Sequence, residues 1–172
     1  QQQGYYSLGF RFASICTLII VAMNPIFMRE LSKAHGRERL EVMRTLFCKY
    51  LRMIYFIVAA MAVFFAFHSN EIIYVFGGEK WSSASWPFFL MALYPLNAVY
   101  GQLNSSVYFS TERTKAYRNI LLLLMVVGLP ISYILVAPGD YFIPGLQLGA
   151  VGLSIKKLAV QFIAVNALAF FN

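Results

Sequence analysis

The chain of 172 residues is 60% hydrophobic and 17% aromatic, and only 12% of its residues are charged, whereas a soluble domain averages about a quarter charged residues. This composition excludes an ordinary soluble domain and indicates a membrane protein. A net charge of +7 would suggest nucleic-acid binding in a soluble protein. The charges here lie mostly between apolar runs, so we expect no nucleic-acid partner.

Five apolar windows approach the roughly 20 residues that a membrane-spanning helix needs. They cover residues 5–28, 50–67, 87–109, 120–136 and 146–171. We therefore expect an all-α, polytopic bundle of about five transmembrane helices, which forms a single unit over residues 1–172. The sequence lacks an initial Met and its last residues still have the composition of a membrane helix, so we expect a fragment of a longer protein.

The connections between the windows alternate in charge. Residues 29–49 and 110–119 are rich in Lys and Arg, whereas the other two connections hold Glu71, Glu79 and Asp140 with a lone Lys80. Cytoplasmic loops of membrane proteins are enriched in Lys and Arg. We therefore expect residues 29–49 and 110–119 to be cytoplasmic and the other two connections to lie outside.

Two connections are expected to contain local structure of their own. Leu40, Met43 and Phe47 recur at helical spacing among charged residues, which predicts either an amphipathic helix on the membrane surface or a solvated extension of the following span. The stretch "FGGEKWSSASWP" combines paired glycines, small polar residues and two tryptophans. We expect it to form a turn with Trp81 and Trp86 at the membrane interface.

Three cations, Arg11, Lys156 and Lys157, lie inside the expected spans, whereas all seven acidic residues lie in connections. An unpaired charge at the centre of a membrane helix costs about 2.5 to 3.5 kcal/mol even on lenient insertion scales. The three cations must therefore face water, an anionic ligand or a carboxylate elsewhere in the protein.

Polar residues share helix faces with two of these cations, and a third span carries a polar stripe without a charge. The three sets are Ser7, Arg11 and Ser14; Ser154, Lys157 and Gln161; and Asn97, Asn104 and Tyr108. We expect them to form the walls of one hydrated cavity that binds substrate. Helix-to-helix contact remains open for the third set, as does snorkelling to the membrane surface for Arg11.

Helical spacing turns Lys156 about 100° away from Lys157. Lys157 shares the face of Ser154 and Gln161, whereas Lys156 can snorkel outward or reach a neighbouring helix. Lys157 is therefore the better candidate for a ligand contact, with Lys156 retained as a second one.

The sequence contains few of the motifs that indicate an enzyme. The spans contain no carboxylate pair, the chain has no Gly-rich phosphate loop, and its two histidines, His35 and His68, fall on opposite sides of the expected membrane. We expect no catalytic residues, no metal site and no cofactor.

Five ordered segments resemble a known family. They are "GYYSLGFRFAS", "NPIFMRELSKA", "NEIIYVFGGEKWSSASWPFFLMAL", "STERTKAY" and "GLQLGAVGLSI", and their order and spacing resemble bacterial Wzx-type polysaccharide flippases of the multidrug/oligosaccharidyl-lipid/polysaccharide (MOP) exporter superfamily. The resemblance implies a partial MOP/MATE-like fold, with this chain in the second of two helical bundles around a central cavity.

The resemblance also implies a function. Such a protein moves undecaprenyl-pyrophosphate-linked oligosaccharide across the bacterial inner membrane by alternating access, in contact with membrane lipids and with the remaining half of the transporter. The family's cationic cavity carries over to Arg11 and Lys157, although the two lysines after "GAVGLSI" depart from the usual pattern. Two alternatives stay open: a drug or cation antiporter of the same superfamily, and a membrane assembly subunit that transports nothing.

Overall fold

The computed structural model describes residues 2–137 and 145–170, and helices make up nearly all of this range. Asp140 and residue 171, at the end of the last expected span, lie outside the described residues. The elements are α1 (Gln2–Gly36), α2 (Leu40–Phe67), α3 (Ser69–Gly77), a short 3-10 helix η1 (Glu79–Ala84), α4 (Ser85–Ser110), α5 (Thr114–Val136) and α6 (Gly149–Phe170).

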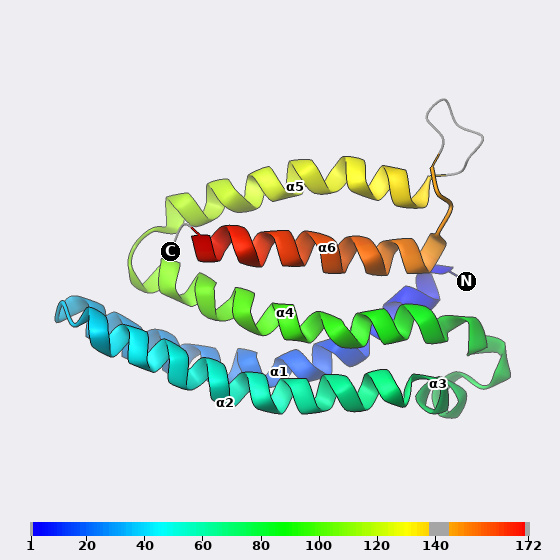
Figure 1. Cartoon of the computed structure of the whole chain (residues 1–172), viewed down its shortest axis with the longest axis horizontal. Helices are drawn as coiled ribbons and strands as arrows, with labels where there is room; N and C mark the ends of the chain where they lie inside the picture. Colours follow the sequence, from blue (N-terminus) through cyan, green and yellow to red (C-terminus); the bar gives the residue numbers. More distant parts are fainter. Residues whose placement is uncertain (1, 138–144, 171–172) are drawn as a thin grey trace.

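The predicted all-α, polytopic bundle is confirmed. Among the described residues, α1, α2, α5 and α6 are each long and apolar enough to cross a membrane. Helix α4 has 26 residues, but Asn97, Gln102 and Asn104 make it more polar than the other long helices. It lies in the middle of the bundle, where it packs mainly against α1, α2 and α6 (Figure 1). Protein rather than lipid therefore surrounds much of α4, and the count of five spans stays a prediction.

Helices α1, α4 and α6 run in the same direction, and α2 and α5 run opposite to them (Figure 1). Hydrogen bonds join the ends of the parallel helices. The backbone N–H of Ala150, at the start of α6, donates to Oε1 of Gln2 at 3.1 Å, and the hydroxyl of Tyr108 donates to the carbonyl of Leu168 at 2.9 Å. The basic α1–α2 and α4–α5 connections therefore lie at one end of the bundle, and α3 and η1 lie at the other.

The basic connections are much shorter than the sequence indicates. Only residues 37–39 and 111–113 separate the helices, because α1, α2 and α5 continue well beyond their apolar windows. Helix α2 is continuous from Leu40 onward, and its Phe47 and Tyr50 rings pack on Phe27 of α1 with centroids 6.4 and 4.9 Å away. Of the two predicted possibilities for this segment, the structure therefore shows the helical extension.

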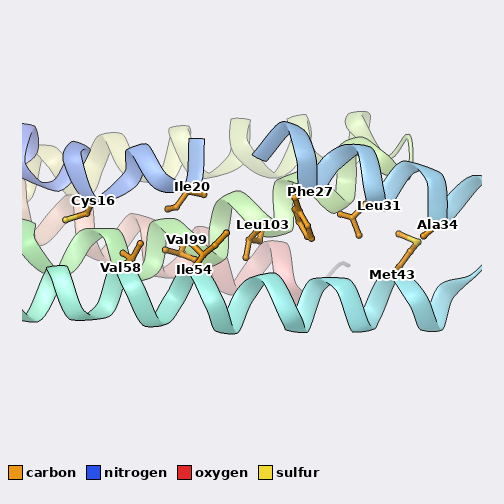
Figure 2. Close-up of a cluster of buried hydrophobic side chains, with 10 residues drawn as sticks. All are labelled: Cys16, Ile20, Phe27, Leu31, Ala34, Met43, Ile54, Val58, Val99 and Leu103. Carbon is orange, nitrogen blue, oxygen red and sulfur yellow. The ribbon is translucent and has the colours of Figure 1, made fainter. Parts of the chain in front are cut away.

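A dry core joins α1, α2 and α4. Its fully buried members include Cys16, Ile20 and Phe27 of α1, Ile54 and Val58 of α2, and Val99 and Leu103 of α4. Figure 2 shows these side chains pointing into the space between the three helices. Within a membrane, close packing of this kind is the main force that holds helices together.

At the end of the bundle away from the basic connections, two short helices form where the sequence predicts a turn. They are α3 and η1, and Trp81 packs inward with its ring centroid 5.4 Å from that of Tyr5. Gly77 allows this position, because a Cβ there would lie 2.5 Å from Cγ of Trp81. Trp86 is 71% exposed. Trp81 therefore contacts the protein rather than standing free at the membrane interface.

Candidate functional site

A polar cavity of about 270 Å³ lies between α1, α4, α5 and α6. Its side chains capable of hydrogen bonding come from all four helices: Ser14, Thr17, Tyr94, Gln102, Ser105, Tyr117 and Gln161. Small residues on α4 create the space, since a Cβ at Gly101 would lie 3.0 Å from Nε2 of Gln161. Hydroxyl and amide groups both donate and accept hydrogen bonds, so this lining suits a polar, uncharged group such as a sugar.

Lys157 lies at the edge of this cavity. Its Nζ is 5.1 Å from the ring centroid of Tyr94 and 5.9 Å from that of Phe10, and both rings belong to the cavity lining. A cation over two aromatic faces gains about 0.5 to 2 kcal/mol. The rings hold the ammonium group in place without neutralising it, so it remains able to attract an anion.

Among residues 2–137 and 145–170, no carboxylate forms a salt bridge with Lys157. In this range, Nζ of Lys33 pairs with Glu30 at 3.2 Å, and Nδ1 of His68 lies 3.9 Å from a carboxylate oxygen of Glu71. In the same part of the chain, no three His, Cys, Asp or Glu side chains come close enough to hold a metal ion.

The structure separates the two lysines as the helical spacing predicts. Lys156 points toward α5, where a Cβ at Gly128 would lie 4.0 Å from its Cε. Ser154 is fully buried, and its hydroxyl donates to the carbonyl of Ala150 at 2.9 Å and reaches that of Pro87 at 3.5 Å. Ser154 therefore packs α6 against the start of α4, whereas Gln161 lines the cavity.

The three predicted residues of α1 divide between the cavity and the surface. Ser14 lines the cavity, and its hydroxyl donates to the carbonyl of Phe10 at 2.8 Å. Ser7 and Arg11 are exposed on the neighbouring part of the helix and lie outside the cavity lining. Arg11 is thus placed beside the cavity rather than in its wall.

The predicted stripe on α4 does not form a single wall of the cavity. Asn104 lines a different hollow of about 330 Å³, which it shares with Arg44 and Tyr100. Tyr108 is fully buried and donates its hydroxyl to Leu168 of α6, while Asn97 is partly exposed outside the cavity lining. The three residues differ in position from the expectation because the neighbours of a helix face, not its polarity, decide what that face contacts.

The polar faces expected from the sequence do not include Thr17, Tyr94, Gln102 or Ser105, all of which line the cavity. The helical spacing holds the missing signal, because Tyr94, Ala98, Gly101 and Ser105 follow each other at intervals of four, three and four residues. This face lies one residue, or about 100°, from the one that the asparagines define.

The fold and the site together define a class: an all-helical membrane protein with a polar cavity among its helices and a lysine at the cavity edge. Within that class, the chain belongs to the family described as "Polysaccharide biosynthesis protein", whose model matches residues 1–86, half of the 172 residues. No curated protein and no solved structure matches the chain. The matched half includes Ser7, Arg11 and Ser14 and ends before Lys157.

Proposed function

We propose that the protein is a flippase, which moves lipid-linked oligosaccharide repeat units across the inner membrane by alternating access. The observation that carries the proposal is the position of Lys157 at the edge of a cavity lined by hydroxyl and amide groups. Lys157 has no carboxylate partner among the described residues. The substrate of such a flippase combines the same two chemistries, a charged phosphate linkage and neutral sugar hydroxyls.

In this mechanism, Lys157 attracts a phosphate or a sugar carboxylate, and Arg11 on the neighbouring surface of α1 adds a second positive charge. Gln161, Gln102 and Ser14 hydrogen-bond to sugar hydroxyls. The cavity of about 270 Å³ lies below the usual range of about 300 to 1,000 Å³ for ligand pockets. The helices must therefore move apart to admit a repeat unit, while the lipid tail stays in the bilayer.

The charge distribution sets the proposed direction. Both basic connections lie at the same end of the bundle, and such connections face the cytoplasm in membrane proteins. The substrate would then enter from the leaflet at this end and leave at the end that carries α3 and η1. No covalent step is required, and no residue is assigned a catalytic role.

An antiporter of the same superfamily is less well supported. That chemistry uses a carboxylate inside the membrane to bind H⁺, Na⁺ or a cationic drug. The acids among residues 2–137 and 145–170 are Glu30, Glu38, Glu41, Glu71, Glu79 and Glu112, and all of them lie at helix ends or in connections.

Charge replacement tests the proposal in the full-length protein. Lys157→Gln should lower surface polysaccharide about tenfold or more, because a hydrogen bond to a charged group contributes about 1.5 to 3 kcal/mol. Lys157→Arg should retain most of the activity. The matched control is Lys80→Gln, which removes one exposed charge from η1. Unchanged polysaccharide in both Arg11→Ala and Lys157→Ala, at normal protein levels, would contradict the cationic site.

A second measurement separates transport from synthesis. In cells that carry Lys157→Gln, lipid-linked repeat units should accumulate in the cytoplasmic leaflet, where a sugar-modifying reagent reaches them only in inverted vesicles. Loss of the lipid-linked units themselves would instead place the protein in synthesis or assembly.

A further inference from the structure

Another hollow, of about 470 Å³, opens on the surface where the end of α4 meets the start of α5. Its lining changes character along α5. Lys115 and Arg118 lie near the basic end of the bundle, and Leu122 and Met125 follow along the helix. Lys115 and Met125 are ten residues apart, or about 15 Å at ~1.5 Å per residue. The groove thus has a cationic head and an apolar floor.

The groove opens outward from the bundle. Leu122 is 55% exposed and Met125 is 67% exposed, and α5 is the least buried of the four apolar helices among the described residues. The side chain of Phe109, from the last turn of α4, forms the opposite wall. A flexible hydrocarbon chain could therefore lie along α5 while its polar end rests among the cations.

The charges favour an anionic occupant. No acidic residue of the described ranges lines the groove, and the first turn of α5 contains none. Thr114 adds a hydroxyl group beside the two cations. Basic pockets at the cytoplasmic ends of membrane helices bind anionic lipid headgroups, and each Lys or Arg near the membrane surface contributes about 1 kcal/mol.

We propose that this groove binds a phospholipid with an anionic headgroup, its phosphate between Lys115 and Arg118 and one acyl chain along Leu122 and Met125. The proposal is independent of the transport site, because Arg11 and Lys157 take no part in it. The lipid ties the α4–α5 connection to the cytoplasmic leaflet.

A hollow on α2 offers a useful contrast. It measures about 660 Å³ and also carries cations, Arg44, Lys49 and Arg52, but Glu41 lies among them. The positive charge of the α2 hollow is therefore partly offset by a carboxylate, unlike that of the α5 groove. Charge at the basic end does not by itself make a lipid site.

Native mass spectrometry of the full-length protein, released from detergent, tests the proposal. The protein is titrated with dioleoyl phosphatidylglycerol, which is anionic, and with dioleoyl phosphatidylcholine, which is zwitterionic. The double variant Lys115→Gln/Arg118→Gln should weaken phosphatidylglycerol binding about 25-fold, at about fivefold for each cation. The matched control Arg37→Gln/Arg39→Gln removes the same charge from the α1–α2 turn and should change binding less than twofold.

A third variant tests the apolar floor without altering charge. Leu122→Trp fills the groove at an exposed position and should also weaken phosphatidylglycerol binding. Equal binding of the two lipids, or full retention of phosphatidylglycerol by both groove variants, would overturn the proposal. So would displacement of the lipid by inorganic pyrophosphate at equal concentration, because this would show a phosphate site without a lipid. Surface polysaccharide in the Lys157 variants is a separate readout, so either proposal can fail alone.

Discussion

The two sides of α4 differ in how completely they are filled. Toward α1 and α2, Val99 and Leu103 lie in a dry core without exposed surface. Toward α5 and α6, Gly101 and Ser105 border a polar cavity of about 270 Å³. One helix thus serves both as a packing element and as a cavity wall. Substitutions on the dry side should therefore lower the stability of the protein. Substitutions on the polar side should cost little stability and should instead change what the cavity admits.

The largest effect is expected in the dry core. Phe27 is fully buried and its ring packs on Tyr50, so Phe27→Ala should lower the free energy of unfolding by about 3 kcal/mol through the cavity that it leaves. Unfolding in detergent, followed by circular dichroism, measures this change. Phe67→Ala is the control, since Phe67 is 80% exposed and its loss should cost little. Equal losses of unfolding free energy in Phe27→Ala and Phe67→Ala would contradict the role of the dry core in stability.

Two glycines of the same bundle should respond differently to the same added methyl group. A Cβ at Gly9 would lie 3.0 Å from Cβ of Met91 and 3.2 Å from the backbone Cα of Phe88, whereas one at Gly101 would meet only side-chain atoms, Nε2 of Gln161 at 3.0 Å and Cγ2 of Val165 at 3.1 Å. Gly9→Ala should therefore cost about 2 kcal/mol by forcing α1 and α4 apart. Gly101→Ala should cost less than about 1 kcal/mol, because the amide can move into the cavity. Thermal midpoints in detergent compare them, and a larger loss at Gly101 would contradict the assignment of the two sides.

Adjacent serines on α4 sharpen the comparison further. The hydroxyls of both serines reach the carbonyl of Gln102. Ser106 is fully buried and its hydroxyl also reaches the side-chain oxygen of Asn24 on α1, whereas Ser105 borders the cavity. Ser106→Ala should destabilise the protein by about 1.5 kcal/mol, because the Asn24 oxygen loses a buried donor. Ser105→Ala should change stability by less than about 0.5 kcal/mol. Chemical denaturation of the two variants in the same detergent measures both free energies of unfolding. A larger loss for Ser105→Ala than for Ser106→Ala would contradict the prediction.

The smallest effect concerns the contact between α4 and α6. Tyr108→Phe removes the hydrogen bond to the carbonyl of Leu168 and should cost about 1 kcal/mol. Because this contact lies at the end of α6, the loss should appear as faster hydrogen exchange in the last turns of that helix. Uniformly faster exchange along α6 would show instead that Tyr108 supports the whole cavity wall.

The positions of the long helices could be predicted from apolar runs, but their ends could not. An apolar window reports the thickness of the bilayer, whereas α1 and α2 continue beyond it because Leu31, Ala34 and Met43 pack between them. The short helices α3 and η1 escaped prediction because their length is below what periodicity can detect. Their packing depends on Trp81, whose partners lie far away in the sequence.

The candidate site could be predicted only in part, for a related reason. Ser14 and Gln161 line the cavity and Lys157 lies at its edge. All three belong to expected polar faces that include a cation, and their role in binding stays a prediction. Asn104 and Tyr108 have the same polar character, but Asn104 lines a different hollow and Tyr108 is buried against Leu168 of α6. A polar face on one helix indicates that it contacts another polar group or water. Only the packing of the bundle shows which group that is.

The position of Trp81 gives the molecule its own optical reporter. The chain holds two tryptophans: Trp86 is exposed, whereas the ring of Trp81 lies edge-on to that of Tyr5 near the start of α1. If α1 tilts during a transport cycle, the surroundings of Trp81 must change, while those of Trp86 need not. With Trp86 replaced by Phe, the tryptophan fluorescence of residues 1–172 would follow the motion of α1 without any attached dye.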